Sequence, residues 1–314
     1  MSDRTIRLVL AIGDPKPERW TEPLKSSLPG ASIEVFSENT PIGEADYAIV
    51  WRPPAALFEQ QTRLKAIFCI GAGVDGLIAV PTLPDDVPVV RLENAGMAVQ
   101  MAEYVAYQII DVSRDMSLYR EQQARNIWKP QRPIDRPAWP VGIMGLGQIG
   151  GRVAKMLTQL EYPVHGWSRS RHEIDQVRSY AGQDEFKDFL NASRILVNTL
   201  PLTDDTRGII NAETIDQLLP EAVIINVGRG GHLNENDLLK ALAERRVMRA
   251  ALDVFENEPL PEEYPFWRDP HIRITPHVAA TTLRNETIAQ IADKILALEA
   301  GRTITGIVDR QYNY

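Results

Sequence analysis

The sequence predicts an α/β protein of two domains, each built on a doubly wound parallel sheet, with a cleft between the domains. Short apolar runs alternate with helical patterns in both halves of the chain, and this alternation is typical of parallel sheets covered by helices. A proline-rich stretch at 128–140 separates the halves, and a glycine-rich turn follows the first apolar run of the second half. The length of 314 residues suits about two domains of ordinary size.

The first half opens with a series of short apolar runs that are bounded by Gly, Pro or Asp. Runs of this kind, several of them rich in β-branched residues, are typical of buried strands. We therefore expect strands at 7–13, 31–36, 47–51, 66–70 and 87–92.

A long helix is predicted after these strands, at about 98–124. Its apolar residues Val105, Ile109, Val112 and Met116 follow helical spacing and share one face. The stretch 128–140 then repeats proline, which excludes helix and central strand and predicts a loop before the second sheet.

The second half shows the clearer alternation of strand and helix. Strands are expected at 141–144, 164–168, 195–200, 223–227, 249–254 and 272–275. Helices are expected between them at 148–159, 185–192, 212–219 and 235–244, and a last helix at 283–298.

Composition and charge narrow the class of protein. Apolar residues make up 44% of the chain and charged residues 24%, which is typical of a soluble globular protein. The net charge of −8 argues against nucleic acid or an anionic membrane as the main partner. We see no signal peptide, membrane span or metal-ligand motif. The lone Cys69 allows no intramolecular disulfide, so we expect a cytoplasmic protein.

The segment 141–150 combines a strand, a G-x-G-x-x-G turn and the start of a helix. Gly145 permits the tight turn, Gly147 lets a pyrophosphate approach the backbone, and Gly150 lets the helix pack close to the strand. The N–H groups and the dipole at the helix start favour phosphate. We expect dinucleotide binding by Gly145, Leu146, Gly147, Gln148, Ile149 and Gly150.

The end of the next strand indicates which dinucleotide binds. An NAD site usually has Asp or Glu about 20 residues after the glycines, to hold the ribose 2′-hydroxyl. Here the chain reads Trp167, Ser168, Arg169, Ser170 and Arg171, with no acid. Arginine and serine would form charge-assisted hydrogen bonds with a 2′-phosphate, so we predict NADP(H) bound by Trp167, Ser168, Arg169 and Ser170.

Three further motifs each follow a predicted strand of the second sheet and carry Arg229, Glu258 and His277. The carboxyl ends of parallel strands converge on the ligand crevice, so these residues can meet. Arg229 could bind and polarise a 2-keto acid, His277 could donate the proton, and Glu258 could orient the imidazole and favour its charged form. Each residue alone could be structural or solvated. The three together, in a chain that also carries a dinucleotide-binding turn, favour a catalytic role.

These motifs resemble those of the D-isomer-specific 2-hydroxy acid dehydrogenase family over nearly the whole chain. The resemblance implies that Arg229, Glu258 and His277 are the catalytic set. It implies that the loop 71–75 binds the substrate carboxylate through Ala72, Gly73 and Val74. It also implies cofactor contacts from Leu200 and Pro201 over the adenosine, from Val227 and Gly228, and from Asp253 to the nicotinamide amide.

Within the family, the segments 50–54, 71–75, 167–169 and 308–310 are most similar to those of bacterial glyoxylate and hydroxypyruvate reductases. This similarity implies NADPH-dependent reduction of a small 2-keto acid, with Trp51 at the substrate pocket. A broader D-2-hydroxy acid dehydrogenase and a catalytically silent dinucleotide-sensing protein remain as alternatives.

The resemblance also implies a domain organisation. A flavodoxin-like substrate domain would combine 1–100 with 281–314, and a Rossmann-like cofactor domain would comprise 101–280. The family is usually dimeric, so we expect a homodimer, with no nucleic acid or membrane partner.

Overall fold

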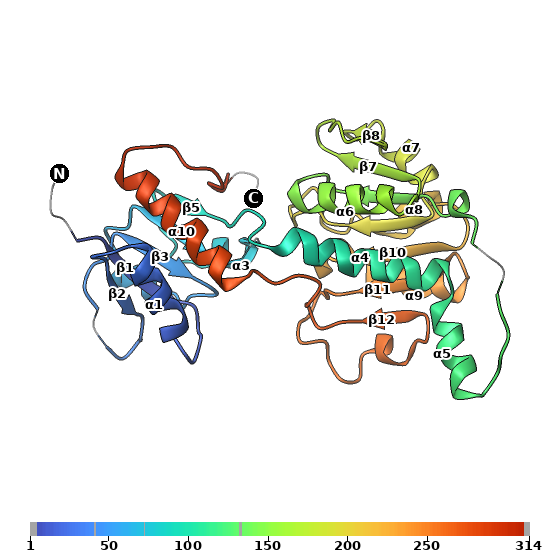
Figure 1. Ribbon diagram of the computed structural model, residues 1–314, viewed down its shortest axis with the longest axis horizontal. Coiled ribbons are helices and arrows are strands. Elements are labelled where there is room, and N and C mark those ends of the chain that lie inside the picture. Colours follow the sequence, from blue (N-terminus) through green and yellow to red (C-terminus); the bar gives the residue numbers. More distant parts are fainter. Residues whose placement is uncertain (1–4, 41, 72, 132–133, 311–314) are drawn as a thin grey trace. The chain divides into compact units, whose positions relative to one another are not determined.

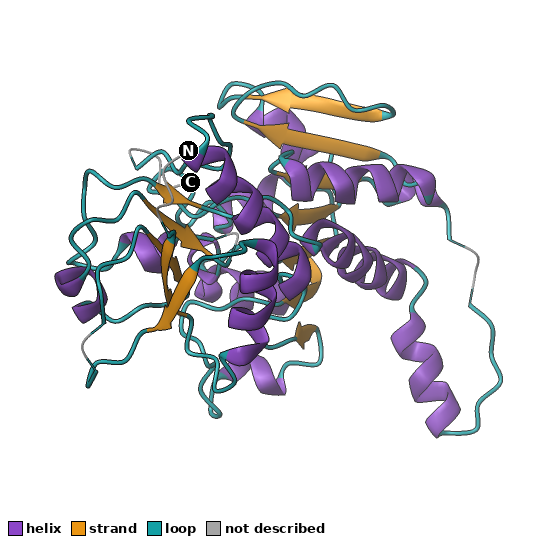
Figure 2. Ribbon diagram, turned by 60° about the vertical axis from the view of Figure 1, so that its left-hand side comes forward, coloured by secondary structure: helices purple, strands orange, loops and turns teal. Residues whose placement is uncertain are grey.

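The computed structural model describes residues 5–40, 42–71, 73–131 and 134–310. The chain forms two compact units (Figure 1). Unit 1 comprises the chain up to Gly96 together with the chain from Thr281 onward, and unit 2 is Met97–Ala280. Each unit contains one parallel sheet flanked by helices (Figure 2), so the predicted α/β fold class is confirmed.

The sheet of unit 1 has, within the described residues, the strand order β2-β1-β3-β4-β5, and every neighbouring pair is parallel. Its strands are β1 (Arg7–Ala11), β2 (Ser32–Val35), β3 (Tyr47–Val50), β4 (Ala66–Cys69) and β5 (Val89–Val90). The unit's helices are α1 (Glu18–Ser27), α2 (Ala56–Gln60), α3 (Asp75–Ile78) and α10 (Arg284–Glu299). This strand order is the flavodoxin-like one, in which ligands bind outside the carboxyl ends of the strands.

Different helices cover the two faces of this sheet. Along β1, Leu8 points into one core and Val9 into the other, as the two-residue period of a strand requires. The Leu8 core is closed by α1 and α10, which lie against each other. Four buried residues of α10 belong to it: Ile288, Ile291, Ala292 and Ile295. The last helix therefore completes a core whose strands begin the chain.

The sheet of unit 2 has the order β12-β11-β10-β9-β6-β7-β8, again parallel throughout the described residues. Its strands are β6 (Val141–Met144), β7 (Val164–Ser168), β8 (Val177–Ala181), β9 (Ile195–Asn198), β10 (Ala222–Asn226), β11 (Val247–Leu252) and β12 (Ile272–Ile274). Counted from β6, the order is the 3-2-1-4-5-6 of dinucleotide-binding sheets, extended by β12. The order reverses between β6 and β9, so a ligand crevice is expected beside the end of β6.

Helices cover both faces of this second sheet. One face packs against α4 (Met97–Ser113) and α6 (Gln148–Gln159), which lie side by side in Figure 1. The other face packs against α7 (Phe186–Asn191), α8 (Ala212–Gln217) and α9 (Glu235–Ala243). Unit 2 also contains three short 3-10 helices among its described residues: η1 (Arg136–Ala138), η2 (Gly230–His232) and η3 (Pro265–Arg268).

The prediction of a single helix at 98–124 is wrong, because the chain forms two helices there, α4 and α5 (Met116–Ala124). Asp115 lies between them with φ of 51°, a left-handed conformation that aspartate tolerates better than most residues. The buried carboxylate of Asp111 then binds Arg120 of α5 at 2.8 Å and Arg273 of β12 at 2.6 Å. These ion pairs tie α5 to α4 and to the sheet.

Candidate functional site

The glycine-rich turn joins β6 to α6 at the point where the strand order of unit 2 reverses. Gly145 has φ of 93°, which favours glycine. A Cβ built on Gly150 would lie 1.8 Å from the Gly145 carbonyl oxygen, so no larger residue fits there. The geometry of the turn therefore requires glycine at both positions.

Gly147 differs from the other two glycines of the turn. It caps the start of α6 with φ of −65°, which any residue adopts. Apart from its two chain neighbours, no described residue has a heavy atom within 4 Å of a Cβ built there. The protein itself does not require glycine at this position, whereas a ligand lying against the backbone would.

The strand β7 ends at the segment predicted to select the cofactor. Ser168 is buried and donates its hydroxyl to the carbonyl of Ser170 at 2.7 Å, while Arg169 and Ser170 are exposed. The indole of Trp167 donates to the Gly182 carbonyl at 2.8 Å and packs on Phe186. The Trp167 side chain thus belongs to the core, and the predicted cofactor contact at this residue can come only from its backbone.

The second arginine of this segment is already engaged. Arg171 forms an ion pair with Glu185 and donates to the Ser179 carbonyl. Glu185 also accepts the Ala181 N–H, and this backbone bond, together with Arg171, lowers the pKa of its carboxyl. Arg171 is therefore held toward β8.

Two fully buried asparagines connect the ends of β9 and β10. Asn198 donates to the Asn226 side-chain oxygen at 2.9 Å, and its own side-chain oxygen accepts the Leu200 N–H at 3.2 Å. Asn226 accepts the Gly228 N–H at 3.2 Å and donates to the Arg229 carbonyl at 3.0 Å. These bonds fix the two loops predicted to carry cofactor contacts and the substrate arginine.

Arg229 follows β10 and is half-buried. Its guanidinium donates to the Gly228 carbonyl at 2.8 Å, and its backbone N–H donates to Nδ1 of His232 at 3.0 Å. The next residue, Gly230, packs against the following strand end, since a Cβ built there would lie 1.9 Å from the Phe255 carbonyl carbon. This close approach places the Arg229 loop against the loop that carries Glu258.

Glu258 and His277 meet at the ends of β11 and β12. Oε2 of Glu258 lies 2.8 Å from Nδ1 of His277, and Oε1 accepts the Phe255 N–H at 3.0 Å. Side-chain exposure is 29% for Glu258 and 42% for His277, so the pair lies open at the surface of unit 2. With Nδ1 held by the carboxylate, Nε2 is the ring atom left to exchange a proton with a ligand.

The backbone turn of His277 is held by Asp253. His277 has φ of 55°, and its N–H donates to the Asp253 carbonyl at 2.9 Å. The Asp253 carboxylate, which is 2% exposed, accepts the N–H groups of Val278 and Ala279 and the Thr275 hydroxyl. The Thr275 oxygen also lies 2.7 Å from the Tyr104 hydroxyl of α4. Asp253 thus fixes the loop that presents His277, a role that the sequence did not indicate.

The predicted substrate residues of unit 1 follow β3 and β4. The ring of Trp51 lies over Gly71, where an added Cβ would sit 2.2 Å from Trp51 Cζ3. Gly73 and Val74 lie between β4 and α3, and Cys69 donates its thiol to the Gly73 carbonyl at 3.7 Å. Ala72, also predicted to bind substrate, lies outside the described residues.

Sequence reasoning missed His232, whose ring is fully buried and bonds both Arg229 and Pro201. The described residues contain no group of three or more His, Cys, Asp or Glu side chains that could hold a metal ion. In the same part of the chain, no helix has the length and apolarity needed to cross a membrane.

Comparison with known proteins identifies similar chains. Residues 106–279 match the model of the D-isomer specific 2-hydroxyacid dehydrogenase NAD binding domain. Glyoxylate/hydroxypyruvate reductase A of Serratia proteamaculans is 43% identical over 304 residues, covering 95% of this chain and 96% of that protein. The protein of the same name from Yersinia enterocolitica is 41% identical over 297 residues, covering 93% and 95%.

Solved structures agree with this similarity. The NADPH-dependent glyoxylate/hydroxypyruvate reductase of Sinorhizobium meliloti, in complex with NADP and sulfate, has a TM-score of 0.93 at 33% identity. A D-isomer specific 2-hydroxyacid dehydrogenase of Xanthobacter autotrophicus, in complex with NADPH and MES, has a TM-score of 0.93 at 34% identity. In both cases 99% of this chain and 100% of the other chain are covered.

Proposed function

Because the chain belongs to the D-isomer specific 2-hydroxyacid dehydrogenase family, we propose that it is an NADPH-dependent reductase of small 2-keto acids. Glyoxylate would give glycolate, and hydroxypyruvate would give D-glycerate. Relatives named as glyoxylate/hydroxypyruvate reductases share 41–43% of their residues with it over nearly their full length. The observation that carries the proposal is the Glu258–His277 pair beside the Arg229 loop in a dinucleotide-binding sheet.

The reaction adds a hydride to the keto carbon and a proton to the keto oxygen. When bound, NADPH would supply the hydride and be oxidised to NADP⁺. Arg229 binds the substrate carboxylate with its guanidinium and polarises the carbonyl. His277 donates the proton from Nε2, while Glu258 accepts from Nδ1 and stabilises the charged ring. The atoms balance, because one hydride and one proton convert the ketone to the 2-hydroxy acid.

The cofactor site fits NADP(H) in two places. At Gly147, the open space beside the backbone and the start of α6 suit a pyrophosphate. At the end of β7, Arg169 and Ser170 are exposed where a 2′-phosphate would be bound. The loops that follow β9 and β10 lie at the carboxyl ends of the strands on the other side of the glycine-rich turn. These loops carry Leu200, Pro201, Val227 and Gly228.

We assign cofactor binding, together with Arg229 and His277, to unit 2, and further substrate contacts to unit 1. In unit 1, Trp51, Gly73 and Val74 lie at the carboxyl ends of adjacent strands, where flavodoxin-like sheets bind ligands. The bulk of the Trp51 ring limits the space over Gly71, which suits a small keto acid.

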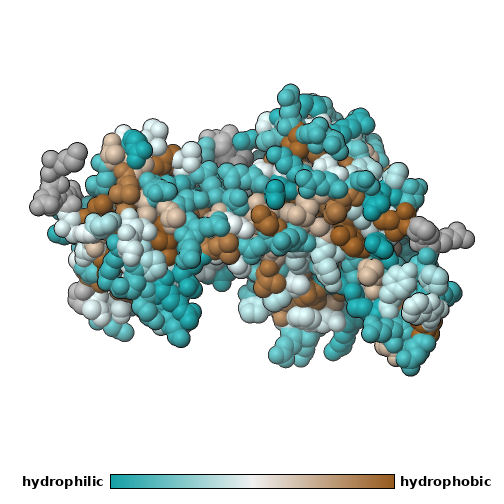
Figure 3. Space-filling view, in the orientation of Figure 1, coloured by the Kyte–Doolittle hydropathy of each residue, from teal (hydrophilic) through white to brown (hydrophobic). Residues whose placement is uncertain are grey.

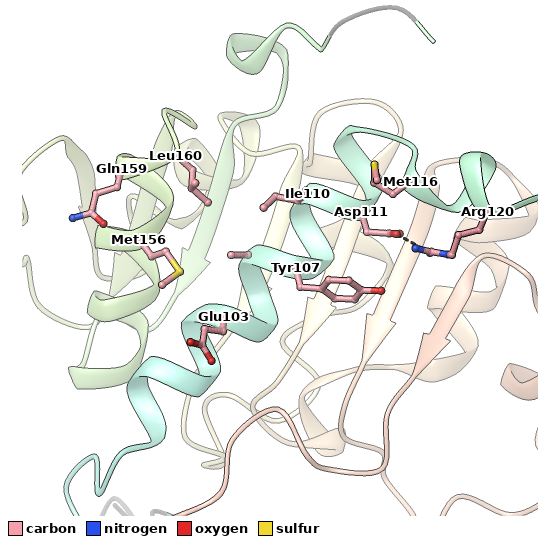
Figure 4. A pocket seen from close by; sticks show the side chains of 10 residues that line it. Glu103, Tyr107, Ile110, Asp111, Met116, Arg120, Met156, Gln159 and Leu160 are labelled. Atoms are coloured by element: carbon pink, nitrogen blue, oxygen red, sulfur yellow. Dashed lines mark hydrogen bonds and ion pairs between the residues drawn. The ribbon is translucent and has the colours of Figure 1, made fainter. Parts of the chain in front are cut away.

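The protein is proposed to act in the cytoplasm as a homodimer. A single cysteine suits a reducing compartment. In unit 2, an apolar pocket opens between α4, α5 and α6, with the side chains of Tyr107, Met116, Met156 and Leu160 at its walls (Figure 4). Hydrophobic side chains also reach the surface over α4 and α6 in Figure 3. A second copy covering this face would remove them from water, and Tyr107→Glu should then shift the mass in light scattering from dimer to monomer.

The decisive experiment follows NADPH oxidation with glyoxylate, hydroxypyruvate, pyruvate and phenylpyruvate. The proposal expects the highest kcat/KM for glyoxylate and hydroxypyruvate, and the lowest for phenylpyruvate, which has the largest side chain. A preference for phenylpyruvate would indicate a broader D-2-hydroxy acid dehydrogenase. Tight NADPH binding without turnover on any keto acid would indicate a sensing protein and would overturn the proposal.

A further inference from the structure

His232 closes the short helix η2, three residues after Arg229, and its ring has no exposed surface. Two loops meet at this ring. Nδ1 lies 3.0 Å from the Arg229 backbone nitrogen, and Nε2 lies 3.1 Å from the Pro201 carbonyl oxygen. The first contact belongs to the loop after β10, and the second belongs to the loop after β9.

The partners of His232 determine its tautomer. The Pro201 carbonyl can only accept a hydrogen bond, so Nε2 must carry the hydrogen. In the neutral ring, Nδ1 is then an acceptor for the Arg229 N–H. The Arg229 carbonyl also lies near Nδ1, but it already accepts from Asn226 Nδ2 at 3.0 Å and from the His232 N–H at 3.2 Å.

The charges around the ring favour this neutral form. Burial lowers the pKa of His232, and the nearby guanidinium groups of Arg229 and Arg207 add to the effect. The hydrogen bonds to Pro201 and Arg229 oppose the shift without reversing it. A proton on Nδ1 would remove the acceptor that holds the Arg229 N–H.

The surrounding network leaves the ring little freedom. A Cβ built on Gly228 would lie 3.1 Å from His232 Nδ1 and 2.8 Å from Asn198 Nδ2, so the chain approaches both side chains closely. Asn198 and Asn226 hold the same two loops from the sheet side. His232 connects the same two loops from its position in η2, which follows Arg229.

We propose that His232 is a positioning residue that fixes the backbone of Arg229 against the Leu200–Pro201 loop. Through its two nitrogens, it sets the substrate-binding arginine at a constant place relative to the segment that covers the cofactor. The inference rests on the proposed function, because it assigns Arg229 to the substrate and Leu200–Pro201 to the cofactor.

Two substitutions separate the two contacts. In His232→Gln, the side-chain amide can reach Pro201 as Nε2 does, but no acceptor remains at the Nδ1 position. In His232→Asn, the side-chain oxygen can replace Nδ1 toward Arg229, but the side chain is too short to reach Pro201. The Gln variant therefore tests the contact with Arg229, the proposed substrate residue. The Asn variant tests the contact with Pro201, on the loop proposed to cover the cofactor.

The expected results are opposite for the two variants. His232→Gln should raise KM for glyoxylate by about tenfold and leave the Kd of NADPH nearly unchanged, because a buried hydrogen bond is lost only at Arg229. His232→Asn should raise the Kd of NADPH, by about the same factor, and affect KM for glyoxylate less. A merely structural histidine would lower Tm in both variants and move both constants together, which would overturn the proposal.

His165→Gln is the matched control. His165 lies on β7 of the same sheet, is half-buried and contacts the Tyr180 ring, away from both loops. Its substitution should leave KM for glyoxylate and the Kd of NADPH at the wild-type values. If it reproduced the His232→Gln profile, the effect would be general to this sheet and the proposal would fail.

A measurement on the unaltered protein serves if the variants do not fold. Nitrogen NMR of the histidine-labelled protein should find His232 as the neutral Nε2–H tautomer at neutral pH. A charged ring or an Nδ1–H tautomer would overturn the inference. Failure of the proposed function is separable, because it would appear as absence of keto-acid turnover in the wild type, before any variant is compared.

Discussion

Asp253 holds His277 through the main chain and not through the imidazole. Its carbonyl accepts the His277 N–H, and its buried carboxylate accepts the N–H groups of the next two residues. The imidazole is left to Glu258, 2.8 Å from Nδ1. One acid therefore fixes where the histidine lies, and the other fixes how its ring is turned.

Asp253→Asn is expected to disturb the His277 loop. The amide nitrogen of asparagine would replace one carboxylate oxygen and would face the N–H of Ala279 or Val278, so one hydrogen bond would be lost. The loss of a hydrogen bond in a buried site lowers stability by about 1–3 kcal/mol. The displaced loop should also lower kcat by roughly tenfold or more. Urea unfolding and steady-state kinetics check both, with Asp269→Asn as control. An effect confined to NADPH affinity would instead support the predicted nicotinamide contact.

His277 and Glu258 are expected to act as a unit. His277→Ala should lower kcat for reduction by roughly 10²–10⁴-fold, because the proton donor is lost, and should leave NADPH binding intact. Glu258→Gln should cause a smaller loss, since the ring loses its charged partner but keeps an acceptor. The double variant should be no slower than His277→Ala, because groups that act together are not additive. Additive losses would mean that Glu258 has a separate role.

Arg169 is expected to select NADPH over NADH. Arg169→Ala should reduce the ratio of kcat/KM for the two cofactors by about tenfold or more, because a charge-assisted hydrogen bond to the 2′-phosphate is lost. Arg171→Ala is the matched comparison and should have a smaller effect, since its guanidinium is held by Glu185 and Ser179. A wild-type enzyme that preferred NADH would refute the assignment.

Gly71→Ala is expected to move Trp51. The added methyl carbon would lie 2.2 Å from Trp51 Cζ3, so the ring must turn out of its place. Overpacking of this kind costs about 1–3 kcal/mol, and KM for glyoxylate should rise by a comparable factor of roughly ten. Gly76→Ala is the control, because the described residues leave open space at its Cβ. Tryptophan fluorescence and KM check the result; an unchanged KM would remove Trp51 from the pocket.

His232 is expected to make the protein less stable in mild acid. Its folded-state pKa is lowered by burial and by two arginines, so below about 6.5 the unfolded chain binds a proton that the native chain does not. Stability therefore falls as pH drops through this window, by at most about 1.4 kcal/mol per pH unit for one group. His165 contributes with the same sign, because burial lowers its pKa too. Between pH 7 and 5, His232→Gln should lose less stability than the wild type in urea unfolding; equal losses would contradict this.

The elements with strong local patterns could be predicted from the sequence. The strands of unit 2 are continuous apolar runs, and the glycine turn has a fixed spacing, so β6, the turn and α6 were expected at their observed positions. Arg229, Glu258 and His277 were expected to gather because each follows a parallel strand, and the Glu258–His277 contact is present.

Other features depend on tertiary contacts that no local pattern reveals. The break at Asp115 is accompanied by ion pairs of Asp111 with Arg120 of α5 and with Arg273, which is distant in the sequence. The helix α1 contains Pro23, which argues locally against a helix, and the strand β8 is only partly buried, so it lacks a continuous apolar run. His232 follows two glycines and belongs to none of the recognised sequence motifs. Its role is visible only in the folded chain, where the Pro201 carbonyl lies beside its ring.

The return of α10 to the first sheet has a consequence for the order of folding. Translation delivers β1 to β5 early, but the face that contains Leu8 and Phe68 lacks Ile288, Ile291 and Ile295 until the last helix leaves the ribosome. Unit 2 is contiguous in sequence and can complete its cores before that moment. The nascent protein therefore carries an uncovered apolar surface through most of its synthesis, and this interval is when chaperones would bind it and when aggregation competes with folding.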